Sequence, residues 1–135
     1  MPVELEIVSP EKLLLSRPVE MVVIPAYEGE MGVLGGHSPM IVLLRGGTIR
    51  LYENGNVTER LYVSGGFAEV TPTRVTILAT EAIAAESLVR GEGERRLAAA
   101  EAEYAAADKA DIDALDTAMD HMQSARAMVE AAPAG

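Results

Sequence analysis

The sequence contains neither Cys nor Trp, and it has only one Phe and four Tyr among its 135 residues. Without Cys, the chain cannot form a disulfide, a thiolate zinc site or a cysteine nucleophile. Because aromatic residues are so few, a hydrophobic core has to be built from Val, Ile, Leu, Met and Ala. Such a core is expected, since 49% of the residues are hydrophobic.

Basic residues are scarce as well: 11 Lys and Arg stand against 21 Asp and Glu, and the formal net charge is −10. Neither half of the chain offers the basic surface that nucleic-acid phosphates or anionic lipids select. Apolar runs such as 22–24 and 40–44 fall far short of a membrane span, and residues 1–4 do not resemble a signal peptide. We therefore expect a soluble protein that binds no nucleic acid and associates with membranes only through a partner.

Catalytic and metal-binding patterns are missing too. The only two His are His37 and His121, and no group of His or carboxylates has metal-ligand spacing. His37 precedes Ser38, but there is no Gly-x-Ser-x-Gly motif. None of the glycine pairs belongs to a Gly-x-x-x-x-Gly-Lys-Ser/Thr phosphate loop. The sequence thus predicts no catalytic residue, no metal site and no cofactor.

What the first part of the chain does contain is a series of short strand patterns. Val3, Leu5 and Ile7 alternate with Glu, which is typical of a half-buried strand. The segment 53–56, Glu-Asn-Gly-Asn, predicts a hairpin turn, because Asn and Gly accept positive φ. Turn signals recur at intervals of about 8–12 residues, which favours an all-β sandwich or barrel. Further strands are predicted at 13–15, 19–24, 49–51, 57–63, 67–70 and 75–79.

One loop prediction concerns the acidic segment 28–33, Glu-Gly-Glu-Met-Gly-Val. We interpret it as a flexible loop with an exposed Met. Together with Glu53, its two Glu residues would form either a solvated rim or a partner contact, since loops on rigid sheets often carry such contacts.

From about residue 82 the composition changes to Ala-rich, with apolar residues at helical spacing. Two helices joined by a short turn at 108–111 are predicted, with Asp111 as the N-cap of the second. Helices of this kind are marginal alone, so the hairpin is expected to need the β domain or another protein. Each helix is predicted to have one apolar stripe: Leu97, Ala100, Tyr104 and Ala107 on the first, and Ile112, Leu115, Met119, Met122, Arg126 and Val129 on the second.

Four segments of the β-rich part together resemble the ε subunit of F-type ATP synthases, called δ in mitochondria. Residues 28–39, Glu-Gly-Glu-Met-Gly-Val-Leu-Gly-Gly-His-Ser-Pro, are similar to the family's Gly-Glu-hydrophobic-Gly and Gly-His-small-Pro signature. Segments 46–50, 62–70 and 75–79 resemble its Gly-x-hydrophobic-Arg, hydrophobic-Ser-Gly-Gly-x-x-Glu-Val and Val-Thr-hydrophobic-Leu-Ala patterns. The resemblance covers essentially the whole chain, because that family also ends in a helical hairpin.

The resemblance implies an α+β protein in sequence order: a β-sandwich of about ten strands over 1–85, an antiparallel helical hairpin over 86–131 and a flexible tail at 132–135. It also implies a non-catalytic rotor subunit of the central stalk, peripheral to the cytoplasmic face of the bacterial inner membrane. Its partners would be γ, the c ring and, transiently, the α/β hexamer. The residues carried over are Glu30, Met31 and Gly32 for the c ring, and Ser9, His37 and Val42 for γ.

Two properties of the family are not expected here. Members that bind ATP carry Ile/Leu-Asp-x-x-Arg-Ala, but the Asp, Arg and Ala are replaced in this chain, so tight ATP binding is not predicted. The matching positions are Leu88, Val89, Glu92 and Gly93. Residues 111–130 contain five acidic residues and one Arg, so we expect a hairpin that inhibits ATP hydrolysis weakly or not at all. The alternative function is a free-standing β-sandwich binding or adaptor module, with Glu30 and His37 in a ligand loop.

Overall fold

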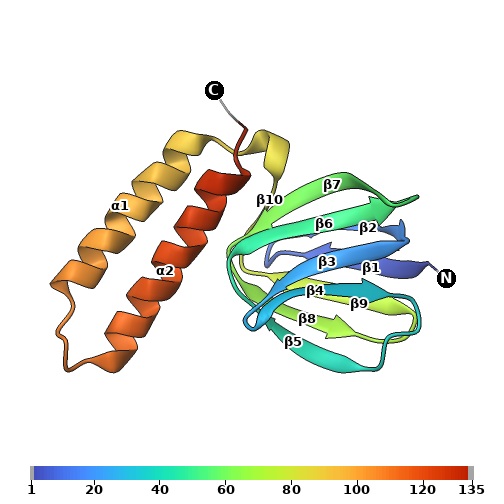
Figure 1. Ribbon diagram of the computed structural model, residues 1–135, viewed down its shortest axis with the longest axis horizontal. Helices are drawn as coiled ribbons and strands as arrows, with labels where there is room; N and C mark the ends of the chain where they lie inside the picture. Colours follow the sequence, from blue (N-terminus) through green and yellow to red (C-terminus); the bar gives the residue numbers. More distant parts are fainter. Residues whose placement is uncertain (1, 134–135) are drawn as a thin grey trace.

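The computed structural model describes residues 2–133, which form a β-sandwich with a helical hairpin at one end (Figure 1). Within these residues there are ten strands, one short 3-10 helix and two α-helices. The elements are β1 (Val3–Val8), β2 (Leu13–Val19), β3 (Met21–Ala26), β4 (Gly29–Leu34), β5 (Met40–Leu44), β6 (Gly47–Glu53), β7 (Asn56–Val63), β8 (Gly66–Val70), β9 (Arg74–Ala79), β10 (Ala82–Ala84), η1 (Ala85–Ser87), α1 (Arg90–Ala106) and α2 (Ile112–Ala131). The predicted fold class is confirmed.

The strands form two packed layers that share a wholly aliphatic core. Their order is β10-β7-β6-β3-β5-β8-β9-β1-β2, and β4 pairs with the other side of β3. The two halves meet at a single Cα pair, Ala26 with Leu44. Alternate residues such as Leu5, Ile24 and Ile77 are completely buried between the layers. No aromatic side chain belongs to this core cluster, as the composition predicted.

The segment 28–33 was predicted as a flexible loop, and this prediction was wrong, because residues 29–34 form β4. The strand pairs with β3 along its whole length, from Gly29 with Ala26 to Leu34 with Met21. Val33 is fully buried, and Met31 packs against the same core. The alternation is therefore present, but Gly29 and Gly32 have no side chains and hide it in the sequence. By contrast, the predicted turn is confirmed: Asn54 and Gly55 have φ of 52° and 77°.

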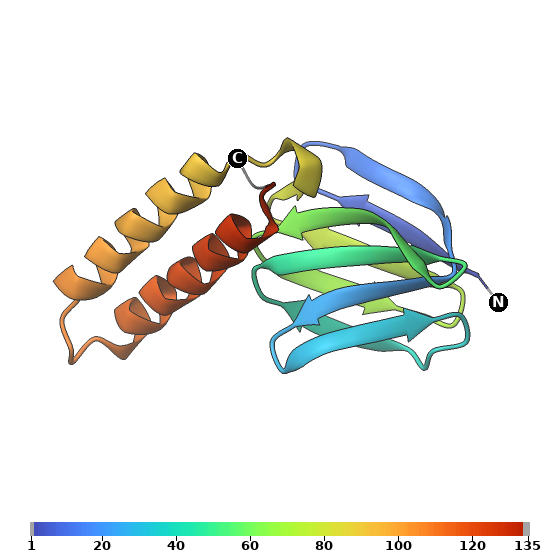
Figure 2. The same cartoon turned by 45° about the horizontal axis from the view of Figure 1, so that its top comes forward.

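The hairpin helices are antiparallel, and α2 lies between α1 and the sandwich in both views (Figures 1 and 2). Asp111 caps α2 as predicted, because its carboxylate accepts a hydrogen bond from the backbone N–H of Ala114 at 3.1 Å. Residues 85–87 form η1, so α1 begins only at Arg90. Ala132 is 9% exposed at the end of α2, although it was predicted to belong to the flexible tail. Residues 134 and 135 of that predicted tail lie outside the described residues.

The predicted apolar stripe of the second helix is only partly correct. Ile112 and Met119 are 67% and 51% exposed, and Arg126 is exposed as well. The buried residues of α2 are instead Ala118, Ala125 and Met128. Small side chains are favoured here because the helices approach closely: a methyl group on Gly93 of α1 would lie 2.8 Å from Cγ2 of Val129. Periodicity alone gave weight to the large residues, whereas close packing selects the small ones.

Candidate functional site

An apolar strip crosses the outer surface of the sandwich on β5, β8 and β9. It consists of Ile41, Leu43, Phe67 and Leu78, which are 74%, 62%, 43% and 37% exposed. The strand register sets Leu43 opposite Phe67 and Phe67 opposite Leu78, so these side chains form a row across three strands. We call these four residues the apolar face. Large contiguous apolar surfaces of this kind mark interaction sites in soluble proteins.

The side chain of Val42, one of the predicted γ contacts, faces the interior of the sandwich. Val42 is 7% exposed and belongs to the sandwich core, so its side chain faces inward and has almost no surface to offer a partner. Its neighbours Ile41 and Leu43 point outward, because successive side chains of a strand lie on opposite faces. The continuous apolar run 40–44 is the sequence pattern that could have indicated a strand with apolar side chains on both faces.

The other two predicted γ contacts lie at opposite ends of the strands that carry the apolar face. Ser9 follows β1, whose last residue Val8 is in register with Leu78. His37 lies in the loop before β5, where the neighbouring Gly36 N–H donates to the carbonyl of Pro72 at 2.7 Å. The His37 ring is half-buried and contacts the Ser38 carbonyl at 2.9 Å. The structure therefore does not bring Ser9 and His37 together.

The three predicted c-ring residues lie on β4, the strand that pairs only with β3. Glu30 and Gly32 are exposed, whereas Met31 turns inward and is half-buried. The Glu30 carboxylate is fixed by a two-pronged ion pair, because Arg50 donates to its two oxygens at 2.8 and 3.2 Å. These hydrogen bonds raise the pKa of Arg50. The exposed feature of this edge is thus a carboxylate with a defined orientation.

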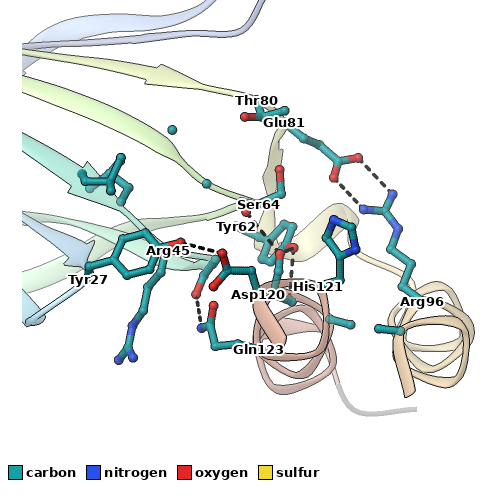
Figure 3. A pocket seen from close by; sticks show the side chains of 18 of the residues that line it. Tyr27, Arg45, Tyr62, Ser64, Thr80, Glu81, Arg96, Asp120, His121 and Gln123 are labelled. Atoms are coloured by element: carbon teal, nitrogen blue, oxygen red, sulfur yellow. Dashed lines mark hydrogen bonds and ion pairs between the residues drawn. The ribbon is translucent and has the colours of Figure 1, made fainter. Parts of the chain in front are cut away.

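A groove of about 810 Å³ lies where the hairpin meets the sandwich (Figure 3). On its α1 wall, Arg96 donates to both oxygens of Glu81, the residue before β10, at 2.6 and 3.0 Å. The Nε of Arg96 also donates to Glu92 at 3.0 Å. These carboxylates raise the pKa of Arg96, and Arg95 and Arg96 lower the pKa of Glu92. The groove also contains Glu103 and Asp120, so acidic groups predominate in it.

The four positions of the altered ATP motif are dispersed around the start of α1. Leu88 is buried in a cluster with Tyr62, Met128 and Ala132, whereas Val89 is 66% exposed. Glu92 is paired with arginines, as described above. Gly93 is buried where α1 contacts α2. Leu88, Glu92 and Gly93 therefore help to hold the hairpin in place, and none of the four positions supplies a cation.

Hydrogen bonds fasten α2 to the sandwich along one side. The Tyr62 hydroxyl lies 2.7 Å from Oγ of Ser124 and donates to the Ser124 carbonyl at 3.1 Å. Gln123 donates to the carbonyl of Gly46 at 2.6 Å. The Tyr27 hydroxyl donates to Asp120 at 3.0 Å. The pKa of Tyr27 is raised mainly by partial burial and also by the neighbouring Asp120 carboxylate. The hairpin is thus attached by few contacts.

Gly46 is the position where this attachment is most sensitive to size. A methyl group there would lie 2.5 Å from Cα of Ser124, so Gly46→Ala should push α2 off the sheet. We expect hydrogen exchange of the α2 amides to accelerate about tenfold or more, since overpacking costs about 1–3 kcal/mol. Gly91→Ala is the matched control, because that site is open on α1, and it should leave exchange unchanged or slower. Equal exchange of α2 in wild type and Gly46→Ala would contradict this contact.

The two His residues and the carboxylates of the described chain do not gather into a site. Among residues 2–133, no group of three or more His, Asp or Glu is arranged to hold a metal ion. His121 of α2 pairs with Glu103 at 2.9 Å, whereas His37 belongs to the sandwich, in the loop before β5. In the described part of the chain, no helix is both long and apolar enough to cross a membrane.

Comparison with known proteins identifies relatives along the whole chain. Residues 2–85 match the family model "ATP synthase, Delta/Epsilon chain, beta-sandwich domain". The ATP synthase epsilon chain of Granulibacter bethesdensis is 69% identical over 128 residues, which cover 95% of each chain. That of Gluconacetobacter diazotrophicus is 50% identical over 132 residues, covering 98% of this chain and 94% of the relative.

Solved structures agree with these relatives. A chain in the cryo-EM structure of the Euglena gracilis mitochondrial ATP synthase (OSCP/F1/c-ring) superimposes with a TM-score of 0.74 at 29% identity. The match covers 93% of this chain and 80% of that one. A chain from the central stalk and c-ring of the Tetrahymena thermophila mitochondrial ATP synthase has a TM-score of 0.64 at 14% identity, with 98% of both chains covered. The second match supports the fold alone.

Proposed function

Because the chain belongs to the family of ATP synthase delta/epsilon chains, we propose that its sandwich joins γ to the c ring through two separate surfaces. The chain is a subunit of the ATP synthase central stalk, with γ and the c ring as its partners. The surfaces we assign to these partners are the apolar face for γ and the Glu30 edge of β4 for the c ring. As part of the rotor, the chain turns with both partners.

The observation that carries this proposal is the apolar face. An isolated chain with Ile41 74% exposed and Leu43 62% exposed keeps a row of large apolar side chains in water. Burying these side chains against a partner would stabilise the complex by about 25 cal/mol per Å² of apolar surface removed from water. These side chains lie outside the aliphatic core of the sandwich, so packing of that core does not explain them. A permanent partner such as γ explains their position.

The Glu30 edge is suited to a different kind of contact. The Glu30 side chain is 55% exposed, and Arg50 holds its carboxylate in one orientation. A charge at the rim of an interface guides docking and register more than it adds affinity. We therefore assign Glu30, with the exposed Gly32 beside it, to the polar loops of the c ring.

The chain is part of an enzyme complex, and we propose that it performs no chemistry itself. Its role would be mechanical: to transmit rotation between the c ring and γ during proton-driven ATP synthesis. In bacteria this places the chain peripherally at the cytoplasmic face of the inner membrane, held there by its partner subunits.

Truncation to residues 1–85 tests the division of labour between sandwich and hairpin. If the sandwich makes the γ contacts, the truncated chain should still co-purify with γ, with an affinity within about threefold of full length. A truncated chain that remains folded, as judged by circular dichroism, but purifies without γ would show that the hairpin is needed for γ binding. Full-length chain that also purifies without γ would favour a free-standing binding module.

The same truncation tests the hairpin. We propose that the hairpin inhibits hydrolysis weakly or not at all, because the acidic residues of α2 would be repelled by acidic surfaces of the catalytic hexamer. ATP hydrolysis by the assembled complex should then change by less than about twofold when residues 86–135 are removed. A severalfold rise in hydrolysis would contradict this proposal.

Mg-ATP is not expected to bind tightly at the junction groove. The only Arg on its α1 wall, Arg96, already donates to Glu81 and Glu92, and a triphosphate would have to displace both carboxylates. Isothermal titration of the full chain should show no binding stronger than about 1 mM. Micromolar affinity that is lost in Arg96→Gln would overturn this prediction.

A further inference from the structure

Three arginines converge on the outer surface of β6 and β7, although the chain as a whole is strongly acidic. Arg50 and Arg60 are directly opposite each other in the β6–β7 ladder, and Arg45 lies in the link between β5 and β6. All three line a groove of about 690 Å³. The other wall of this groove is formed by α2, including Gln123 and Glu130.

This cluster is not explained by pairing inside the chain. Like charges directly opposite each other on neighbouring strands destabilise a sheet. Within residues 2–133, Arg50 pairs with Glu30, but Arg45 and Arg60 make no ion pair. Both are exposed, in a chain that has 21 acidic residues available. A fold that leaves such cations together and unpaired has charge available for an anion.

We propose that this groove binds a phosphate group, carried either by a free phosphate compound or by a phospholipid headgroup. Guanidinium groups donate paired hydrogen bonds that match phosphate oxygens. Thr48 lies two residues before Arg50 on the same face of β6 and adds a hydroxyl donor to the groove. The described residues that line it do not include the positions of the altered ATP motif at the start of α1, so this is a separate site.

Glu30 gives the site a distinctive property. Its carboxylate occupies the guanidinium of Arg50, so a phosphate and Glu30 compete for the same donors. Removing the Glu30 charge should therefore strengthen phosphate binding. Glu28 is an exposed acidic residue on the same β3–β4 hairpin that does not line the groove. It provides the charge-matched control.

The test is a titration of the isolated full chain with inorganic phosphate, followed by backbone amide NMR. Shifts should be confined to residues 45–50, 60 and 123–131. Arg60→Gln should weaken binding about tenfold, and Glu30→Gln should strengthen it about threefold or more. Lys12→Gln removes one positive charge, as Arg60→Gln does, and Glu28→Gln removes one negative charge, as Glu30→Gln does. Neither Lys12 nor Glu28 lines the groove, so both control variants should bind phosphate within about twofold of the wild-type affinity.

A second arm separates the two sources of phosphate. Flotation with phosphatidylglycerol vesicles that is reduced by Arg60→Gln would identify a lipid headgroup as ligand. Phosphate binding without flotation would identify a soluble phosphate compound. If neither probe binds, or if Lys12→Gln weakens binding as much as Arg60→Gln does, the site does not exist. Because γ and the c ring are absent from both assays, failure here would leave the proposed stalk function untouched.

Discussion

Replacing Ile41 and Leu43 together with Asp should weaken binding of this chain to γ by about a hundredfold or more. Each residue is more than half exposed in the isolated chain, and we propose that both become buried against γ. An Asp in a desolvated apolar contact loses the apolar surface and also places an unpaired charge there, at a cost of several kcal/mol. Surface plasmon resonance with immobilised γ measures the change.

The matched control for this double variant is Ile112→Asp. Ile112 is 67% exposed, but it lies at the distal end of the hairpin, where an acidic residue suits the N-terminus of α2. It should bind γ normally. Both variants should unfold at the temperature of the wild type, since none of the replaced side chains belongs to the sandwich core. Unchanged γ affinity in the double variant would rule out the apolar face as the γ surface.

The second large effect concerns folding, at the first residue of β8. Gly66 has φ of +134°, a conformation that side-chain-bearing residues rarely adopt. A methyl group there would also overlap the carbonyl oxygen of Leu78 on the neighbouring strand. Gly66→Ala should lower the free energy of unfolding by about 3–6 kcal/mol, from backbone strain and steric overlap together. Urea denaturation followed by circular dichroism would measure this.

Gly29 separates the two contributions to that effect. It has the same φ of +134°, but a methyl group there would have no atom within 4 Å. Gly29→Ala should therefore lower the free energy of unfolding only by the backbone strain, about 1–3 kcal/mol. If the two variants were equally destabilised, the close approach of β9 to Gly66 would not matter for stability.

The strands that the sequence predicts well are those in which apolar and polar residues alternate. Val3, Leu5 and Ile7 alternate with Glu, and all three are completely buried. β4 was missed because Gly29 occupies an inward position and Gly32 an outward one, so neither face of the strand shows a clear pattern. A Gly gives no hydrophobic signal, yet its backbone pairs in the ladder like any other residue. Pairing with β3 is a tertiary property that no local pattern contains.

The same limit applies to the sites. The motif around Glu30 and His37 could be recognised in the sequence, but not that β4 turns Met31 inward or that Arg50 fixes Glu30. Val42 could be aligned with a family position, whereas its inward orientation depends on strand register. The apolar face combines residues from three strands, so it exists only once β5, β8 and β9 are paired.

The central claim is that γ and the c ring contact different surfaces of one sandwich. Because the chain has no Cys, a single Cys gives a unique attachment point for a photoreactive cross-linker. Glu69→Cys places it beside Ile41 on the apolar face, and Glu28→Cys places it next to the Glu30 edge. In the assembled synthase, the first should cross-link to γ and the second to the c subunit, as identified by mass spectrometry. Cross-links from both positions to the same subunit, or from Glu69→Cys to the c ring, would contradict the claim.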